Sequence, residues 1–418
     1  HRLASDDPVL WARRAPPIFL TGPTHRRRLL YMALRWLVDV PCLVEGPATT
    51  EIFVYEGLVS VYAAQRFMDD IYEQVFGERL ALEPIHYKHE LREMALEAIG
   101  EPTPRQYEMM ECYHSNPEAY FRRMPIDGVM GFTADARLVG TFRLKRPRRV
   151  AEKSSRRIAD YLGQTIRQRA EDAARRRALG RGIPLDEMVS THEEQRREFT
   201  EAESQLADQF QQKKIRLPAE ALNVDDMIGF KLIGREDELA RALKAIEDHP
   251  QASIFEREAH TGEYNATNIL VDLALPKPAD LLRRFRSEDW RFAAGRGLSP
   301  AQLAAGFPEY VDAGAESVRV ELILTSFDEL LESELGRCIH EYRVLEQRYN
   351  RDYRGRMAKN AEFIIEYLLA VAFGPTTDVG DIPCTMWGQY LPETLSHATR
   401  DVYGQLPSGL VLPSIAYR

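Results

Sequence analysis

Two short apolar segments, each interrupted by charged residues, constrain the fold of this chain more than any other feature. The first is the stretch 225–233 (DDMIGFKLI) and the second is the stretch 318–325 (VRVELILT). Their length and their content of β-branched and aromatic residues are typical of β-strands. A carboxylate among apolar neighbours is costly to bury unless it is paired or binds a cation. The sequence therefore predicts two strands whose acidic residues either bind a cation or remain at the surface.

The acidic residues are Asp226 in the first strand and Glu321 in the second. If both strands belong to one sheet, the two carboxylates can hold Mg²⁺ between them, an arrangement that suits phosphoryl or pyrophosphoryl transfer. The structural alternative is that Asp226 caps a strand end and that Glu321 faces solvent on an edge strand. The two segments alone leave both interpretations open.

Strands and helices alternate along the rest of the chain. Apolar runs bounded by turn residues predict further strands, at 128–144 (a strand or hairpin), 253–258 and 269–273. Apolar spacings of three and four residues predict helices, at 236–247, 327–348 and near 357–373. This order predicts the α/β (α+β) class, with a mixed sheet flanked by helices.

Three regions and one insertion are expected. They are a mostly helical N-terminal region at 1–105, a sheet-containing domain at 106–355, and a C-terminal helix and tail at 356–418. The interval 160–215 is rich in Arg, Glu and Gln and is broken by glycine and proline, which predicts an inserted arm of two exposed helices. Such an arm could hold a protein partner or a second copy of the chain.

The charge of the chain is unevenly distributed. A formal net charge of −9 argues against a general nucleic-acid coat. Within 143–181, however, fourteen basic residues stand against four acidic ones, and such a local field can attract phosphate. The four cysteines show no CxxC spacing, so reduced thiols are expected and no zinc site is implied. With no uninterrupted apolar stretch of ~20 residues, we expect a soluble, cytoplasmic protein without a membrane partner.

The basic run begins with a recognisable motif. Arg143, Lys145 and Lys153 have the spacing of the R-x-K-S-x-x-S-I-x-x-K motif, with Arg146 and Arg149 in place of its two serines. In this the chain resembles the synthetase domain of the RelA/SpoT alarmone synthetases, which has a nucleotidyltransferase-like fold. The resemblance covers roughly residues 125–350.

Two further motifs follow in the order of the family. Asp226, Gly229 and Lys231 match D-x-x-[AG]-x-R, with lysine in place of arginine. The segment ending in Asn268 resembles G-Y-x-[SA]-x-H, since it keeps the tyrosine, Tyr264, but lacks the glycine and the histidine.

The last two motifs lie at the C-terminal end of the resemblance. Glu321 keeps the acidic residue of V-E-x-Q-I-R-T, whereas the glutamine and the arginine are absent. His340, Tyr342 and Arg343 resemble the E-H…Y-[KR] element of the final helix at an altered spacing.

The resemblance implies an activity and roles for these residues. It implies transfer of the β,γ-pyrophosphate of ATP to the 3′-hydroxyl of a nucleotide, with Mg²⁺ between Asp226 and Glu321. Glu321 would also help to deprotonate the attacking hydroxyl, and Tyr264 would stack on the acceptor base. Arg143 would stack on adenine or bind phosphate. Lys145 and Lys153 would act as point charges for the phosphates. The nucleotide site would further include Lys231, Asn268, His340 and Arg343.

Several functions remain open at this stage. The missing acceptor residues leave GDP or GTP, an adenine nucleotide and the 3′ end of tRNA as acceptors. A second reading is a catalytically degenerate synthetase fold that senses nucleotides or binds a partner through 160–215. A third is a purely structural helical adaptor. Alarmone hydrolysis is not expected, because the sequence has no His-Asp dipeptide.

Overall fold

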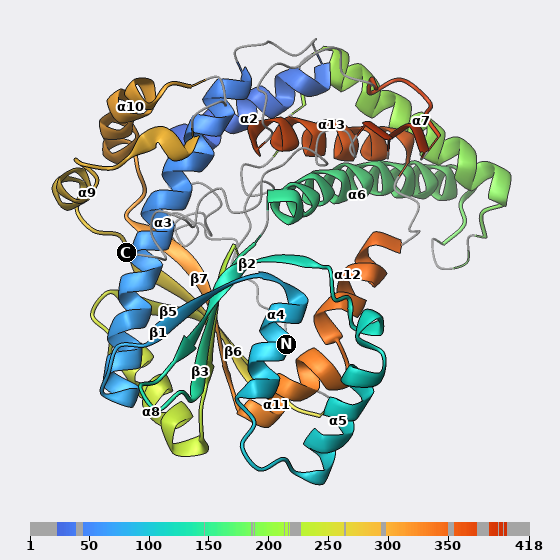
Figure 1. Cartoon of the computed structure of the whole chain (residues 1–418). Coiled ribbons are helices and arrows are strands. Elements are labelled where there is room, and N and C mark those ends of the chain that lie inside the picture. The colour runs from blue at the N-terminus through green and yellow to red at the C-terminus, as the bar shows by residue number, and fades with distance from the viewer. Residues whose placement is uncertain are drawn as a thin grey trace.

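A seven-stranded sheet lies at the centre of the computed structural model (Figure 1). The structure describes residues 23–38, 45–145, 147–184, 187, 189–212, 214–215, 217, 227–262, 265–293, 298–349, 355–373, 384–391, 393–395 and 397–398. The strands are β1 (Ala81–Tyr87), β2 (Pro125–Phe132), β3 (Leu138–Leu144), β4 (Ile228–Ile233), β5 (Ala252–His260), β6 (Ala266–Ala274) and β7 (Ser317–Thr325). Their order in the sheet is β1-β2-β3-β4-β7-β6-β5.

The sheet is mixed, as the sequence predicted. Strands β4 and β7 are parallel neighbours, and the other pairs are antiparallel. The two apolar segments that contain Lys231 and Glu321 are β4 and β7, so they lie side by side at the centre of the sheet. The segment 128–144, predicted to be a strand or a hairpin, is a hairpin formed by β2 and β3.

Helices cover both faces of this sheet and form a further layer beside it (Figure 1). They are α2 (Pro23–Val38), α3 (Glu45–Phe76), α4 (Lys88–Glu97), α5 (Pro104–Ser115), α6 (Pro147–Arg181), α7 (His192–Gln211), α8 (Glu236–Glu247), α9 (Pro278–Arg284), α10 (Pro300–Asp312), α11 (Phe327–Leu331), α12 (Ile339–Tyr349) and α13 (Arg356–Phe373). Within the described residues, none of these helices is both long enough and apolar enough to span a membrane.

The two faces of the sheet differ in character because side chains alternate along a strand. One face is apolar, and the row Val129, Phe142, Phe230, Leu322 and Ile269 crosses five strands of it. These side chains share a core with α3, α8 and α10. The opposite face carries charged side chains and is covered by α4, α5 and α11, whose apolar residues form a smaller core with Ile233 and Met130.

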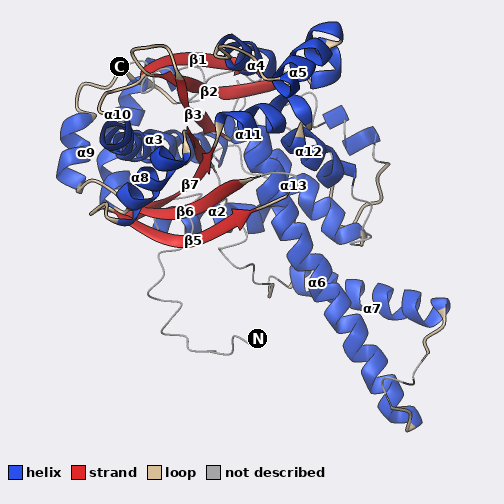
Figure 2. Ribbon diagram, turned by 90° about the horizontal axis from the view of Figure 1, so that it is seen from below, coloured by secondary structure: helices blue, strands red, loops and turns tan. Residues whose placement is uncertain are grey.

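The arm predicted at 160–215 is present as α6 and α7. The first half of α6 packs against α13 in a separate core, to which α2 and the C-terminal half of α7 also contribute. The outer ends of α6 and α7 extend away from the rest of the molecule (Figure 2). Helix α6 ends at Arg181, where glycine and proline in the sequence predicted a break.

One element was not predicted and another differs from the expectation. Within the described part of the region 1–105, which is otherwise mostly helical, β1 is an edge strand in which only Ile85 is buried. A strand with a single buried side chain gives no alternating pattern in the sequence, which explains the difference. The helix expected at 327–348 is divided by a π-helical turn (Glu332–Gly336) and by Cys338, which has a positive φ of 47°. This break turns α12 back toward α4.

Candidate functional site

The charged face of the sheet brings together residues from three central strands. Arg143 on β3 lies opposite Gly229 on β4, which lies opposite Glu321 on β7. Because opposed residues point to the same side of a sheet, the side chains of Arg143 and Glu321 flank the glycine. A Cβ atom at Gly229 would have only Oε2 of Glu321 within 4 Å, at 3.7 Å. The glycine therefore leaves open space beside the carboxylate.

The next row on this face adds two more of the predicted residues. Lys231 on β4 lies opposite Ile323 on β7, which lies opposite Asn268 on β6. Lys231 is two residues after Gly229, so its side chain points to the same face. The structure thus brings Arg143, Lys231, Asn268 and Glu321 together on one face of the sheet.

Four residues that the sequence did not single out complete this site. Lys88 and Arg92 come from α4, Glu334 comes from the π-helical turn, and Glu341 comes from α12. Nζ of Lys88 lies 2.5 Å from Oε2 of Glu334 and 2.7 Å from Oε1 of Glu341. The guanidinium of Arg92 lies 3.2 Å from Oε1 of Glu341, and its Nε donates to the carbonyl oxygen of Glu334 at 2.8 Å.

Glu334 connects this helical group to the sheet. Its Oε1 accepts a hydrogen bond of 3.2 Å from Nη2 of Arg143 and lies 3.9 Å from Nζ of Lys231. The side chain of Glu334 is only 1% exposed. We refer to Lys88, Arg92, Arg143, Lys231, Glu334 and Glu341 as the cation cluster. Its four basic side chains and two carboxylates leave an excess of positive charge in a buried place.

Burial and the surrounding charges shift the pKa values within and beside the cluster. Burial opposes the ionisation of Glu334, but Lys88, Arg143 and Lys231 outweigh it and hold the pKa of this carboxyl well below its ordinary value. Burial lowers the pKa of Lys231 to about 8, against the opposing attraction of Glu334. Burial also lowers the pKa of His340 well below its ordinary value, and the nearby charges of Lys231 and Lys88 add to this effect. His340 is therefore a neutral neighbour of the cluster near pH 7.

Several polar atoms of this face have no hydrogen-bond partner among the described residues. They are Nζ of Lys231, Nε of Arg143, Oδ1 of Asn268 and Oε2 of Glu341. A buried donor without a partner costs about 1–3 kcal/mol, and more when it is charged. Native proteins rarely leave such groups unused. The two donors, Nζ of Lys231 and Nε of Arg143, suit an anion, whereas Oδ1 of Asn268 and Oε2 of Glu341 are acceptors and suit a hydroxyl or another donor.

The remaining predicted residues either lie elsewhere in the structure or are not among the described residues. Lys145 follows β3, where its backbone N donates to the carbonyl oxygen of Met227 at 2.7 Å. Lys153 is half-buried on α6, and Arg343 is exposed on α12. Asp226 and Tyr264 lie outside the described residues.

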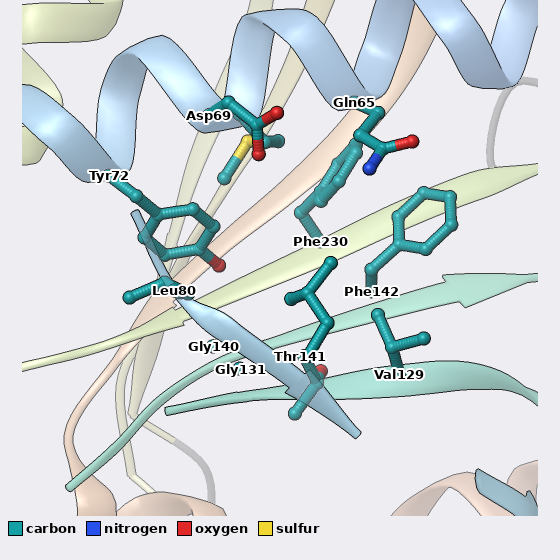
Figure 3. A pocket seen from close by; sticks show the side chains of 12 residues that line it. Gln65, Asp69, Tyr72, Leu80, Val129, Gly131, Gly140, Thr141, Phe142 and Phe230 are labelled. Carbon is teal, nitrogen blue, oxygen red and sulfur yellow. The ribbon is translucent and has the colours of Figure 1, made fainter. Parts of the chain in front are cut away.

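A cavity on the apolar side of the same strands is separate from this site (Figure 3). It lies between α3 and the sheet, and its lining includes Asp69 and Tyr72 of α3 beside Phe142 and Phe230. Its volume of about 30 Å³ is far below the ~300–1,000 Å³ of small-molecule sites. A nucleotide therefore does not fit here, and the charged face is the better candidate.

Comparison with known proteins gives matches among solved structures, two of which are described here. No protein-family model and no curated protein sequence matches the chain. The small alarmone synthetase 1 from Bacillus subtilis has 11% sequence identity and a TM-score of 0.17, and the match covers 40% of this chain and 68% of that chain. A GTP pyrophosphokinase family protein from Streptococcus pneumoniae has 10% identity and a TM-score of 0.20, with 67% of this chain and 86% of that chain covered. At these values the proposals below rest on the residues of the chain itself.

Proposed function

We propose that the chain transfers pyrophosphate from ATP to the 3′-hydroxyl of a nucleotide. The observation that carries this proposal is the excess of buried positive charge beside Glu321. A triphosphate brings several negative charges to one place, and Arg143 and Lys231 have donors free to receive them. The acceptor is GDP or GTP, an adenine nucleotide, or the 3′ end of tRNA.

Glu321 suits the second requirement of such chemistry, which is a carboxylate at the attacking hydroxyl. Glu321 lies beside the open space over Gly229. Strand β4 lies between it and the strand of Arg143, and its own strand, β7, pairs with the strand of Asn268. Glu321 would accept a proton from the hydroxyl, while the basic residues hold the phosphates in line for the displacement. Tyr264, on the connection before β6, would stack on the acceptor base, and Lys145, Lys153 and Arg343 would add positive charge around the nucleotide.

Magnesium belongs to this proposal as well. Carboxylate oxygen is the ligand that Mg²⁺ prefers, so Glu321 fits it, with Asp226 as the second ligand. Within the described residues no group of three or more His, Cys, Asp or Glu could hold a metal by itself. The ion would therefore share its ligands with the substrate phosphates, as Mg²⁺ commonly does, and would neutralise part of their charge.

Transfer of labelled pyrophosphate tests this proposal. The protein is incubated with Mg²⁺, γ-labelled ATP and a panel of acceptors (GDP, GTP, AMP, ADP, ATP and tRNA), and the products are separated by chromatography. Glu321→Gln and Asp226→Asn should each lower the rate about 10²-fold or more, since each removes a charge used in the transition state. Glu316→Gln, at an exposed position just before β7, is the matched control and should keep full activity.

Melting curves for each variant separate loss of chemistry from loss of fold. Undiminished transfer by Glu321→Gln would rule out the carboxylate at the hydroxyl. Absence of a labelled product with every acceptor, in a wild-type protein that binds ATP, would favour the second candidate described next.

The second candidate is a nucleotide-sensing module without catalysis. It is favoured by Glu334, whose carboxylate already forms ion pairs with Lys88 and Arg143 and so neutralises part of the positive charge of the cluster. Such a module would bind nucleotides and pass the signal to a partner through the arm at 160–215. Binding of ATP that does not depend on Mg²⁺, together with no transfer, is the result expected for this function.

A further inference from the structure

A second crevice lies at the other end of the central strands. The parallel strands β4 and β7 end at Ile233 and Thr325, and the chain then leaves them in different directions. From β4 it enters α8, which packs on the apolar face, and from β7 it enters α11, which packs on the charged face. Neighbouring parallel strands whose connections go to opposite faces leave a crevice at their carboxyl ends, where open α/β sheets commonly bind ligands.

A cavity of about 450 Å³ occupies this crevice. Its volume is within the range of small-molecule sites, about 300–1,000 Å³. Apolar side chains line part of it, namely Ile99, Leu138, Ile233 and Phe327. The cavity is not part of the cation cluster, because Ile233 lies at the opposite end of β4 from Gly229.

Two arginines line the side of the cavity formed by the sheet. Arg137 precedes β3, and Arg235 follows β4. Their Nη2 atoms lie 2.7 Å and 2.9 Å from the same oxygen, Oε1 of Glu238. Nε of Arg235 also lies 3.7 Å from Oδ1 of Asp237. Each guanidinium group has five N–H donors, more than these two carboxylates occupy. This side therefore keeps several donors for a ligand carboxylate.

Two carboxylates line the side formed by the helices. Glu101 lies in the connection between α4 and α5, and Asp328 lies in the first turn of α11. Asp328 accepts a hydrogen bond of 2.7 Å from Nε2 of Gln106. Within the described residues neither carboxylate forms an ion pair. This side can therefore receive an ammonium group.

We propose that this cavity binds a small zwitterion with an apolar part, of the size of an apolar α-amino acid or dipeptide. The carboxylate of the ligand binds Arg137 and Arg235, its ammonium group faces Asp328 and Glu101, and its side chain lies against Leu138 and Phe327. A ligand with only one charge leaves one side of the cavity without an ion pair and loses the charge-assisted hydrogen bonds of that side.

Calorimetric titration of the full chain tests the proposal. The ligands are leucine, phenylalanine and leucyl-leucine, together with leucinamide, which has no carboxylate, and N-acetyl-leucine, which has no ammonium group. At least one zwitterion should bind, and removal of either charge should weaken binding about tenfold or more. Arg235→Gln and Asp328→Asn should each weaken it by a similar factor. Arg241→Gln, at an exposed position on α8 outside the cavity, is the matched control and should bind normally.

Two results would overturn the proposal. One is the absence of heat for every zwitterion at millimolar concentration, and the other is equal affinity for leucine and its two singly charged analogues. Because the measurement is binding and not transfer, it does not depend on the outcome for the proposed function. The melting temperature of each variant shows whether a lost response reflects an unfolded protein.

Discussion

Lys231 is the basic residue of the charged face whose environment bears most directly on anion binding. It is 5% exposed, lies 3.9 Å from Oε1 of Glu334, and has no hydrogen-bond partner for its Nζ among the described residues. Burial lowers its pKa from 10.5 to about 8, so that its charge changes just above the physiological range. A bound anion would favour the charged form.

This pKa predicts two pH dependences of opposite sign. Above pH 8 the free protein loses the ammonium charge, so the affinity for pyrophosphate should fall by up to about tenfold for each pH unit. Between about pH 8 and 10.5 the unfolded chain binds a proton that the folded chain does not, so stability without ligand should rise with pH, by about 1.4 kcal/mol per unit at most. Titrations and melting curves from pH 7 to pH 10 measure both.

Lys231→Met keeps the shape of the side chain and should remove both dependences. Lys244→Met, at an exposed position on α8, should keep both. A pyrophosphate affinity of the wild type that does not change through pH 8 would show that Lys231 is not the residue that receives the anion.

At the scale of elements, the side chain of Tyr72 on α3 occupies the space that a side chain at Gly140 on β3 would need. A Cβ atom at Gly140 would lie 2.3 Å from the hydroxyl oxygen of Tyr72 on α3. That hydroxyl donates to the backbone oxygen of Lys231 at 3.1 Å. Helix α3, on the apolar face, is thus hydrogen-bonded to β4, the strand that carries Lys231 on the charged face.

Two glycines in neighbouring strands should consequently respond differently to the same substitution. Gly140→Ala forces Tyr72 away and should lower stability by about 1–3 kcal/mol, the cost of overpacking. Gly229→Ala, where the nearest atom is 3.7 Å away, should change it by less than about 0.5 kcal/mol. Denaturant unfolding of both variants measures the difference. Equal stabilities would show that the helix can shift without cost.

The sheet and its charged strands could be predicted from the sequence, because their signals are local. Apolar runs located β4 and β7, and the charges within them indicated Lys231 and Glu321 as residues of interest. Lys88 and Glu334 were missed, since they are 246 positions apart and each resembles a surface residue of its own segment. A lysine is identified as buried only by the carboxylates that the fold brings to it.

At the scale of the whole molecule, the arm is fixed at its inner part and extends freely at its outer part. Inner residues such as Ile166 and Leu206 are fully buried in the core shared with α13. Farther out, ion pairs join the two helices, with Arg177 lying 2.9 Å from Glu194 and 2.8 Å from Glu198. These side chains are only 9–17% exposed, but they join the two helices of the arm to each other and not to the rest of the molecule.

Replacing 171–198 by a short Gly-Ser linker should accordingly leave the body of the molecule intact. The melting temperature should fall by a few degrees at most, and the pyrophosphate affinity should not change. Leu206→Ala, in the inner part, should cost about 2–5 kcal/mol and serves as the comparison. Loss of pyrophosphate binding in the shortened protein would mean that the arm contributes to the anion site.

The position of β7 has a consequence for the synthesis of the protein. Of the strands among the described residues, β7 is the last to leave the ribosome, yet it pairs between β4 and β6, which are made earlier. Until it emerges, β1–β4 and β5–β6 are two separate ladders with exposed edges, which is the state most exposed to misassociation. The cation cluster needs a still later residue, Glu341. A growing chain thus acquires the complete cation cluster only after Glu341 has been made, and a translation product that ends before this residue lacks it.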